Sequence, residues 1–353
     1  MTDANVGPYL RVRDLRKTYQ VRSGLFGRPH PLQAVAGVSF EVDAGTTFGL
    51  VGESGSGKTT IAKMLMLAEP PTAGSIEVGG QDLGKLTRAD RHRFHRQLQP
   101  VLQDPYSALN PRMRIGRIVD EPLRIHRAMN GAALDAKVRE LLELVGLPAD
   151  GSGRFPHEMS GGQRQRVSIA RALSLDPRCM ILDEPVSALD VSIQAQILNL
   201  LKGLQKRLDL TYLLISHDLA VVAYMSQRVG VLYLGEFMEI ANTPEIVGSP
   251  AHPYTRALIA SVDARSGRRD EHAVSGEIPS PMNPPNGCLF NTRCPYAVER
   301  CRAEKPAFRP LAPTHWVACH FAESLPSSPT VQTLVPPAEP SHTDTRIPIK
   351  EKT

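Results

Sequence analysis

A glycine-rich segment, Gly52–Thr59 with the letters GESGSGKT, places the tightest constraint on how this chain can fold. It follows an apolar, strand-like stretch at residues 47–51 and precedes a helical pattern that begins at Thr60. Strand, glycine loop and helix in this order form the context in which GxxxxGK[ST] binds phosphate. The glycines let backbone N–H groups point at one anion, and the helix dipole attracts the same charge. The segment therefore predicts a nucleotide site, with Lys58 on the β/γ-phosphates and Thr59 on Mg²⁺.

Two carboxylates end a second apolar strand. The run Cys179–Leu182 leads directly into Asp183 and Glu184. Nucleotide hydrolysis needs one carboxylate that holds Mg²⁺ and a base that polarises the attacking water. An Asp-Glu pair alone would be an ordinary loop start. Because a phosphate loop precedes it here, we expect Asp183 to serve the metal and Glu184 to serve the water.

A third pattern, Ser160-Gly161-Gly162-Gln163, comes just before a strongly helical stretch from Arg164 to Leu173. Serine before two glycines at a helix N-terminus caps the helix and offers N–H groups to an anion. Taken alone, this pattern indicates only a well-capped helix. Its presence in the same chain as the phosphate loop favours a second phosphate contact.

Strand-like and helical stretches alternate along much of the chain, which predicts an α/β fold with a mostly parallel sheet and helices on both faces. A Gly/Pro loop is expected at residues 23–31, and residues 115–171 interrupt the alternation as a helical insertion. The expected strands lie at residues 10–13, 38–42, 47–51, 74–80, 99–103, 180–182, 211–215 and 229–233, and the clearest helices at 134–145 and 192–208.

Composition narrows the class of protein. Hydrophobic residues make up 41% of the chain and charged residues 22%, which is ordinary for a globular protein. No apolar run approaches the ~20 residues that cross a bilayer, and the first residues do not resemble a signal peptide. The net charge of +5 permits contact with nucleic acid, but the 5% of aromatic residues are not interleaved with basic ones. We expect a cytoplasmic protein without a nucleic-acid partner.

Taken together, the motifs resemble those of the ATPase subunits of ABC transporters. The resemblance covers about residues 9–245 and implies a P-loop NTPase (RecA-like) core, an N-terminal antiparallel β subdomain and a helical insertion. In the order of that family, the motifs are Walker A at Gly52–Thr59, the Q-loop at Gln103, the signature at Ser160–Gln163, Walker B at Met180–Glu184, the D-loop at Ser187–Asp190 and the H-switch at His217.

The resemblance also implies residue roles. Glu184 would be the catalytic base, and His217 would sense the γ-phosphate. Gln103 would contact Mg²⁺ and the attacking water, and would couple the site to a membrane partner. Tyr19 would stack on adenine.

Other positions would complete the site, partly in a second subunit. Ser160 and Gly162 would contact ATP held by the partner ATPase, and Asp190 would help join the two subunits. The expected nucleotide-binding set is Tyr19, Gly52, Glu53, Ser54, Gly55, Ser56, Gly57, Lys58, Thr59, Thr60, Ser160, Gly161, Gly162, Gln163 and Asp190, with Thr59, Gln103 and Asp183 on Mg²⁺.

Three further segments, at residues 103–112, 251–258 and 279–295, resemble the dipeptide/oligopeptide (or nickel-peptide) importer ATPases. Importers of this group use two ATPase chains, called D-type and F-type, and Gln163 in the signature matches the F-type chain better. The resemblance implies ATP and Mg²⁺ as cofactors, two transmembrane permease subunits, a second ATPase of D-type, an extracytoplasmic peptide-binding protein, and a location on the cytoplasmic face of the inner membrane. An importer of nickel or another solute is the alternative. A non-transport ABC ATPase is disfavoured because the chain lacks a second fused unit and a long coiled-coil insertion.

Four late cysteines have the spacing C-x5-C-x6-C-x17-C. They are Cys288, Cys294, Cys301 and Cys319. Some peptide-importer ATPases carry four such cysteines on a 4Fe–4S cluster, and on this resemblance we expect a cluster here. Zinc, with His315 or His320 as substitute ligands, and thiols without a metal are the alternatives.

These patterns divide the chain into three expected parts. Residues 1–250 would form the ABC ATPase domain, with a helical subdomain at about 104–172. Residues 251–323 would form a C-terminal module with the four cysteines. Residues 324–353, rich in Pro, Ser and Thr, would be a disordered tail.

Overall fold

The structure, a computed structural model, describes residues 7–22, 29–265 and 277–326 of the 353 residues. From residue 327 onward, the expected tail lies outside the described residues. The strands are β1 (Leu10–Arg22), β2 (Pro29–Val42), β3 (Thr47–Val51), β4 (Ala73–Val78), β5 (Gln81–Asp82), β6 (Leu98–Val101), β7 (Cys179–Asp183), β8 (Thr211–Ser216), β9 (Arg228–Tyr233), β10 (Glu236–Asn242), β11 (Arg309–Ala312) and β12 (His315–Val317).

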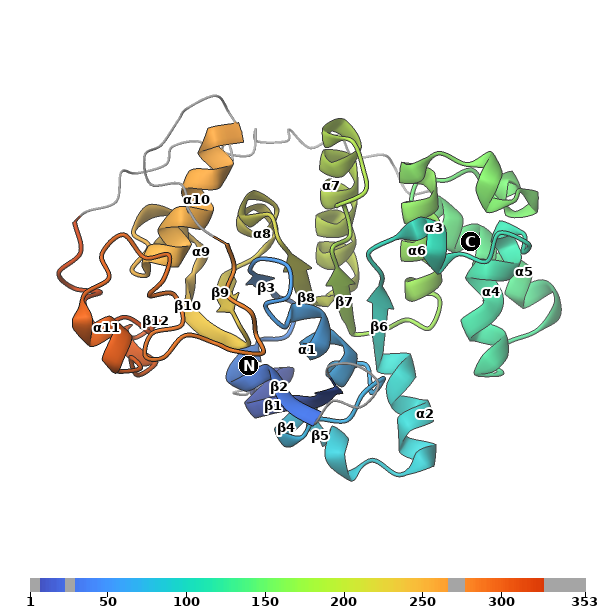
Figure 1. The fold of residues 1–353 in the computed structure, drawn as a ribbon. Helices are drawn as coiled ribbons and strands as arrows, with labels where there is room; N and C mark the ends of the chain where they lie inside the picture. Colours follow the sequence, from blue (N-terminus) through green and yellow to red (C-terminus); the bar gives the residue numbers. More distant parts are fainter. Residues whose placement is uncertain (1–6, 23–28, 266–276, 327–353) are drawn as a thin grey trace, which may run out of the picture.

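Helices connect most of these strands (Figure 1). They are α1 (Lys58–Leu65), α2 (Arg88–Gln97), α3 (Pro105–Ala108), α4 (Ile115–Ile125), α5 (Gly131–Leu144), α6 (Gly161–Leu173), α7 (Val191–Leu208), α8 (Leu219–Met225), α9 (Thr243–Gly248), α10 (Pro253–Arg265) and α11 (Glu299–Ala303), with short 3-10 turns at Leu83–Lys85, Ala149–Gly153 and Pro156–Glu158.

The larger sheet has the order β11-β12-β10-β9-β3-β8-β7-β6 among the described residues. Strands β6, β7, β8, β3 and β9 run parallel, whereas β10, β12 and β11 are antiparallel additions. The expected α/β class with a mostly parallel sheet is therefore confirmed. Because parallel strands end at one edge of a sheet, the loops after β3, β6, β7 and β8 meet there.

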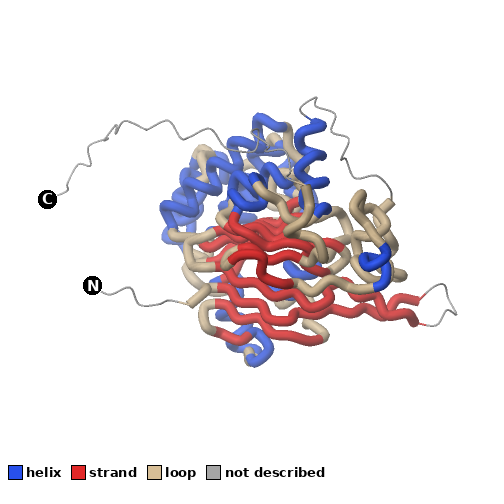
Figure 2. Tube along the Cα trace, turned by 90° about the vertical axis from the view of Figure 1, so that its left-hand side faces the viewer, coloured by secondary structure: helices blue, strands red, loops and turns tan. Residues whose placement is uncertain are grey.

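A smaller antiparallel sheet, β2-β1-β4-β5, forms a separate layer below the larger one (Figure 2). It confirms the expected N-terminal antiparallel subdomain. The expected Gly/Pro loop at residues 23–31 is wrong at its end, because Pro29, His30 and Pro31 pair with the last residues of β1. Proline is tolerated there because β2 is an edge strand, where a missing N–H costs no ladder bond. Residues 23–28 lie outside the described part.

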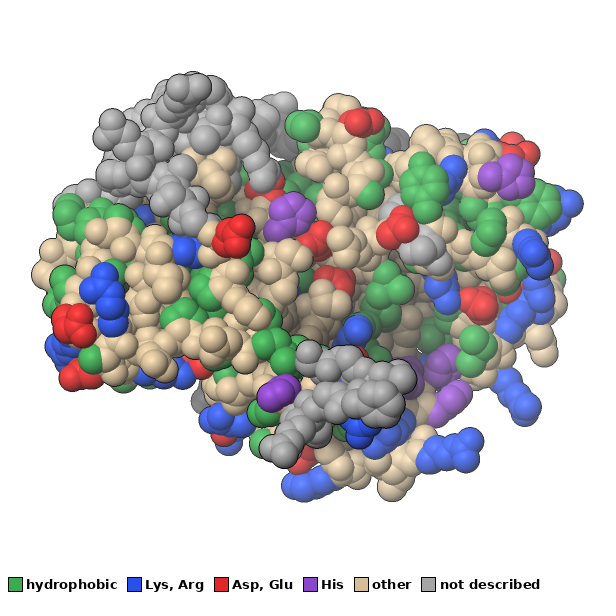
Figure 3. Space-filling model, viewed as in Figure 1, with side chains coloured by type: hydrophobic (Ala, Val, Ile, Leu, Met, Phe, Trp, Pro, Cys, Tyr) green, Lys and Arg blue, Asp and Glu red, His purple; other side chains and the backbone are tan. Residues whose placement is uncertain are grey.

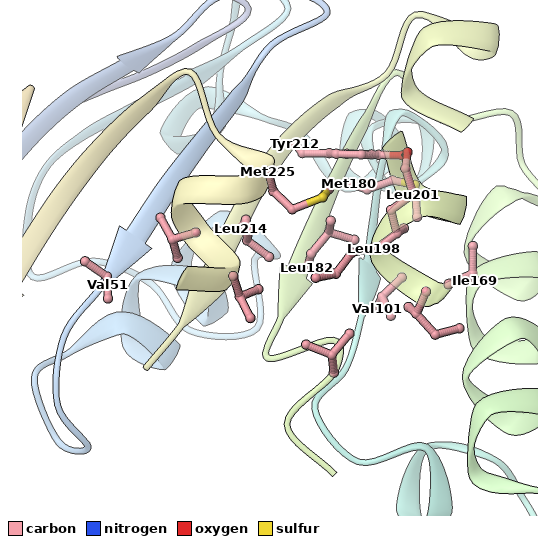
Figure 4. Close-up of a cluster of buried hydrophobic side chains, with 14 of the residues drawn as sticks. Val51, Val101, Ile169, Met180, Leu182, Leu198, Leu201, Tyr212, Leu214 and Met225 are labelled. Atoms are coloured by element: carbon pink, nitrogen blue, oxygen red, sulfur yellow. The ribbon is translucent and has the colours of Figure 1, made fainter. Parts of the chain in front are cut away.

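Strand alternation divides the core between the two faces of the larger sheet. Met180 and Leu182 of β7 point to one face and pack with Leu198 and Leu201 of α7 (Figure 4). Cys179 and Ile181 of the same strand join a cluster on the other face, which also contains apolar side chains of α1 and of the smaller sheet. Helix α1 is thus buried between the two sheets, and this fixes the position of the glycine loop before it.

The helical insertion is observed as α3, α4, α5 and α6. The helix expected at residues 134–145 begins three residues earlier, at Gly131, and ends at Leu144.

At the other end of the sheet, the C-terminal segment, which is the chain from residue 251 onward, adds β12 to β10. Within the described ranges, no helix combines the length and apolar character that crossing a membrane requires.

Candidate active site

The glycine loop joins β3 to α1 and encloses the ammonium group of Lys58, the first residue of α1. The Lys58 Nζ donates hydrogen bonds to the carbonyl oxygens of Gly52 (2.7 Å) and Glu53 (2.9 Å) and to the Ser56 Oγ (3.3 Å). Burial lowers the pKa of Lys58, against the opposite effect of the Glu184 and Asp183 carboxylates. A buried cation within an arc of backbone is suited to receive the charge of a phosphate.

Two glycines of this loop are fixed by close backbone contacts. A Cβ on Gly52 would lie 2.2 Å from the carbonyl oxygen of Leu232. A Cβ on Gly57 would lie 2.4 Å from the carbonyl oxygen of Ala34, and Gly57 also has a φ of +106°. Backbone atoms cannot move away as a flexible side chain can, so only glycine fits at both positions. Ser54, Gly55 and Thr59 are exposed on the open side of the loop.

The three expected catalytic residues come together beside this loop. The Glu184 carboxylate accepts a hydrogen bond from the Gln103 Nε2 (2.9 Å) and lies 3.1 Å from the His217 Nδ1. Glu184 has a φ of +48°, which is strained for a side chain of this kind. Its N–H donates to the carbonyl oxygen of Ile215 on β8 (2.8 Å), and this bond holds the turn.

Asp183 is a candidate ligand for a cation. Its carboxylate is buried, and burial together with the neighbouring Glu184 charge raises its pKa to about 6, against the opposing effects of Lys58 and Lys63. A divalent cation would offset this excess of negative charge. Mg²⁺ prefers oxygen ligands, which Asp183, the Thr59 hydroxyl and the Gln103 amide supply. In Figure 3, acidic and histidine side chains gather in the middle of this face, beside α7 and over the ends of β7 and β8.

Comparisons with known proteins agree with this geometry. The family profile described as "ABC transporter" matches residues 35–187, and the profile "Oligopeptide/dipeptide transporter, C-terminal region" matches residues 238–301. The oligopeptide transport ATP-binding protein AppF of Bacillus subtilis is 48% identical over 91% of this chain and 99% of its own length. The chain belongs to the ATPases of ABC transporters. ATP and Mg²⁺ are accordingly its cofactors.

Other relatives and solved structures agree with this family. The di/tripeptide transport ATP-binding protein DppF of Pseudomonas aeruginosa is 45% identical over 90% of this chain and 98% of its own. The ATP-binding cassette MJ0796, solved as a dimer bound to ADP and Pi, superposes with a TM-score of 0.59 and 26% identity over 66% of this chain and 98% of its own. CbiO1 of Clostridium perfringens, at 24% identity and the same TM-score, shares the fold over 68% of this chain and 90% of its own.

The signature segment of this ABC ATPase does not meet the phosphate loop of the same chain. Ser160 caps α6: its Oγ accepts the Gln163 N–H (3.3 Å), and the Gln163 Oε1 accepts the Ser160 N–H (3.0 Å). Gly162 lies against α7, where a Cβ would be 2.6 Å from the Ile193 Cγ2. Figure 1 shows α6 separated from α1 by β6 and β7. Ser160 is exposed at the start of α6, and α6 lies apart from the phosphate loop of its own chain.

Three further residues of the expected nucleotide-binding set lie on β1, on α1 and just before α7. Tyr19, on β1, donates its hydroxyl to Glu69, and the Lys17 ammonium lies 5.0 Å from the centre of its ring. Thr60 is half-buried in the first turn of α1. Asp190 is exposed and immediately precedes α7. The structure thus gathers Gln103, Glu184 and His217 but leaves Asp190 on the surface.

The expected 4Fe–4S cluster is wrong. All four cysteines line one cavity of about 20 Å³, a volume of roughly one water molecule. Burial raises the pKa of Cys288 to about 11 and of Cys294 to about 12, so without a metal both are neutral thiols. In the part of the chain that the structure describes, which includes these cysteines, no group of three or more His, Cys, Asp or Glu side chains could hold a metal ion. The same finding counts against the zinc alternative.

The two histidines considered as zinc ligands have other partners. His315 lies 2.7 Å from the Glu239 carboxylate, which is fully buried and also accepts the N–H groups of Ala251 and His252. His320 contacts the carbonyl oxygen of Glu304. Glu239 therefore holds β12 and the start of the C-terminal segment on β10, a structural role that no sequence motif indicates.

Sequence reasoning also missed a partner of the phosphate loop. Arg293 forms two hydrogen bonds with the Glu53 carboxylate, at 2.6 and 2.9 Å, across a separation of 240 residues. The Tyr254 hydroxyl accepts the Glu53 N–H (2.9 Å). Both Arg293 and Tyr254 lie in segments that carried the family resemblance. A single arginine or tyrosine in such a segment gives no signal of a distant contact, so the sequence offered nothing by which to find them.

Proposed function

We propose that this ABC ATPase energises the import of dipeptides or oligopeptides across the cytoplasmic membrane. One observation carries the substrate class: residues 238–301 match the profile described as "Oligopeptide/dipeptide transporter, C-terminal region". Relatives that align over nearly their whole length are named as oligopeptide and di/tripeptide transport proteins. The peptide itself would be selected by other chains of the transporter.

ATP hydrolysis would proceed on the residues that surround Glu184. Lys58 and the N–H groups of the loop would bind and orient the phosphates, and Thr59, Gln103 and Asp183 would hold Mg²⁺, which neutralises phosphate charge. Glu184 would accept a proton from the attacking water. His217 and Gln103 would hold the carboxylate in place, which the hydrogen bonds at 3.1 and 2.9 Å support.

A second ATPase subunit would complete each site. Within one chain, α6 lies away from α1, so Ser160–Gln163 would reach the γ-phosphate of ATP only when held by a partner. ATP would then bridge the two subunits, and loss of the γ-phosphate would weaken that bridge. A D-type chain would be this partner.

Permease subunits would dock beside Gln103. A groove of about 180 Å³ lies between the end of β6 and α6, and its lining includes Leu102, Ala108, Pro122 and Ala172. Leu102 is 41% exposed and so offers apolar surface to a partner. A permease helix that moves within this groove would displace Gln103, whose side chain is hydrogen-bonded to Glu184. The ATPase would accordingly sit on the cytoplasmic face of the membrane, with two permeases and an extracytoplasmic peptide-binding protein.

Peptide uptake by a reconstituted transporter tests this function. The chain would be co-purified with its permeases and second ATPase, placed in vesicles with ATP inside, and supplied outside with binding protein and a labelled dipeptide or pentapeptide. We expect label to accumulate only with ATP and not with the Glu184→Gln chain. Accumulation of a nickel chelate with neither peptide transported would overturn the proposed substrate class.

A further inference from the structure

The phosphate loop carries an acidic residue whose charge is neutralised from the far end of the chain. Glu53 is the second residue of the loop, and its carbonyl oxygen accepts a hydrogen bond from the Lys58 Nζ (2.9 Å). Its carboxylate receives both terminal nitrogens of Arg293, a planar two-point contact. Glu53 therefore bonds to the lysine of the loop through its backbone and to the C-terminal segment through its side chain.

The Arg293 side chain is buried among aromatic residues. The Arg293 side chain is 4% exposed, and its guanidinium lies 5.8 Å from the ring centres of both Tyr233 and Phe290. The Tyr233 Oη lies 3.3 Å from the Arg293 Nη1. Tyr254 packs on both rings and accepts the Glu53 N–H. The Glu53 side chain is 24% exposed, so this ion pair is screened less than a pair in which both partners are exposed.

The position of Glu53 makes its charge relevant to ATP. A carboxylate within the loop that binds polyphosphate would repel the ligand if it stood alone. The Glu53 charge acts on Lys58: burial lowers the Lys58 pKa, and the Glu53 carboxylate opposes this effect together with Glu184 and Asp183. A buried, bidentate arginine neutralises that charge.

We propose that Arg293 is a positioning residue for ATP binding, and that it acts by neutralising the charge of Glu53 in the phosphate loop. The C-terminal segment thereby sets the affinity of the ATP site. This inference rests on the proposed role of the phosphate loop in binding ATP. It does not depend on which solute is transported.

Three variants of the full-length chain separate charge from packing. Arg293→Met removes the cation and leaves the Glu53 charge unpaired; Glu53→Gln removes the anion; the double variant removes both. We expect Arg293→Met to weaken binding of Mg·AMP-PNP, measured by calorimetry, by about tenfold. Because the repelling carboxylate is gone, the double variant should recover most of this loss and bind within about threefold of the unmodified chain.

Steady-state kinetics provide the second readout. Arg293→Met should raise KM for ATP and leave kcat nearly unchanged, because the lost interaction acts on binding rather than on the reaction. Arg309→Met is the matched control: Arg309 also pairs with a carboxylate, that of Glu323, in the C-terminal segment, but it makes no contact with the loop. Its nucleotide affinity and KM should not change.

The outcomes are distinct. An Arg293→Met chain with unchanged affinity would overturn the inference, as would a double variant that binds as poorly as Arg293→Met, since this would show lost packing. If Arg293→Met does not fold while the double variant folds and binds, the unpaired carboxylate is still identified as the damaging group. Failure of the unmodified chain to bind Mg·AMP-PNP would overturn the ATP site itself.

Discussion

The side-chain amide of Gln103 donates a hydrogen bond to the Glu184 carboxylate across 2.9 Å and joins residues that are 81 positions apart. Gln103 comes shortly after β6 and Glu184 directly after β7, and these two strands are parallel neighbours. The pairing of the strands therefore produces the contact. This hydrogen bond connects the exposed segment after β6 to the expected base, so a partner that moves this segment would act on hydrolysis directly.

The first prediction concerns Glu184. Glu184→Gln keeps the size of the side chain and removes its ability to accept a proton, so kcat for ATP hydrolysis should fall by roughly 10²–10⁴-fold. Binding of Mg·AMP-PNP should remain within a few-fold of the unmodified chain. Glu140→Gln, which alters an exposed glutamate paired with Lys137 on α5, is the control and should leave both quantities unchanged. Normal turnover by the Glu184 variant would exclude it as the base.

Much of this centre could be predicted because its signals are local. The glycine loop, the carboxylates after β7 and the cap at Ser160 each lie within a few residues. Gln103, Glu184 and His217 were placed in one site by the resemblance to the ABC ATPases, and the structure gives the physical reason: loops at the carboxyl ends of parallel strands converge.

Contacts made by single residues at long range could not be predicted. Arg293 and Glu53 are separated by 240 residues, and neither carries a pattern that points to the other. The prediction of a 4Fe–4S cluster failed for a related reason. The spacing of the four cysteines suggested ligands, but spacing does not determine the size of the cavity between them, which is about 20 Å³. The prediction of a loop at residues 29–31 was wrong because proline excludes a central strand but not an edge strand.

A second prediction contrasts two glycines. Gly52→Ala places a Cβ 2.2 Å from a backbone oxygen, so the loop or β9 must shift. We expect a loss of roughly 1–3 kcal/mol in the free energy of unfolding and no detectable ATP binding. Gly203→Ala, in the exposed middle of α7, meets nothing within 4 Å and should stabilise the chain by about 0.5–1 kcal/mol, because alanine favours helix. Urea titrations would measure both; a Gly52 variant as stable as the unmodified chain contradicts the argument.

A third prediction follows from the Asp183 carboxylate. Its pKa is raised to about 6 by burial and by the Glu184 charge, so it gains a proton as the pH falls through that value. Mg²⁺ needs the ionised form. The affinity for Mg·AMP-PNP should therefore decline below about pH 6, and binding near that pH should release up to one proton. Calorimetry in buffers of different ionisation enthalpy would measure the release. In Asp183→Asn, binding should be weak at every pH, with no proton released by this group.

The last prediction concerns the groove beside Gln103. Leu102 is 41% exposed at the rim of this groove, and a permease helix that fills the groove would bury this exposed part, which contributes about 1 kcal/mol. Leu102→Arg should abolish co-purification with the permeases and stimulation by peptide, while binding of Mg·AMP-PNP by the chain alone stays unchanged. Val298→Arg introduces the same charge at a side chain that is 46% exposed before α11, away from the groove, and should have no effect on assembly. If both variants assemble equally well, the permeases dock elsewhere.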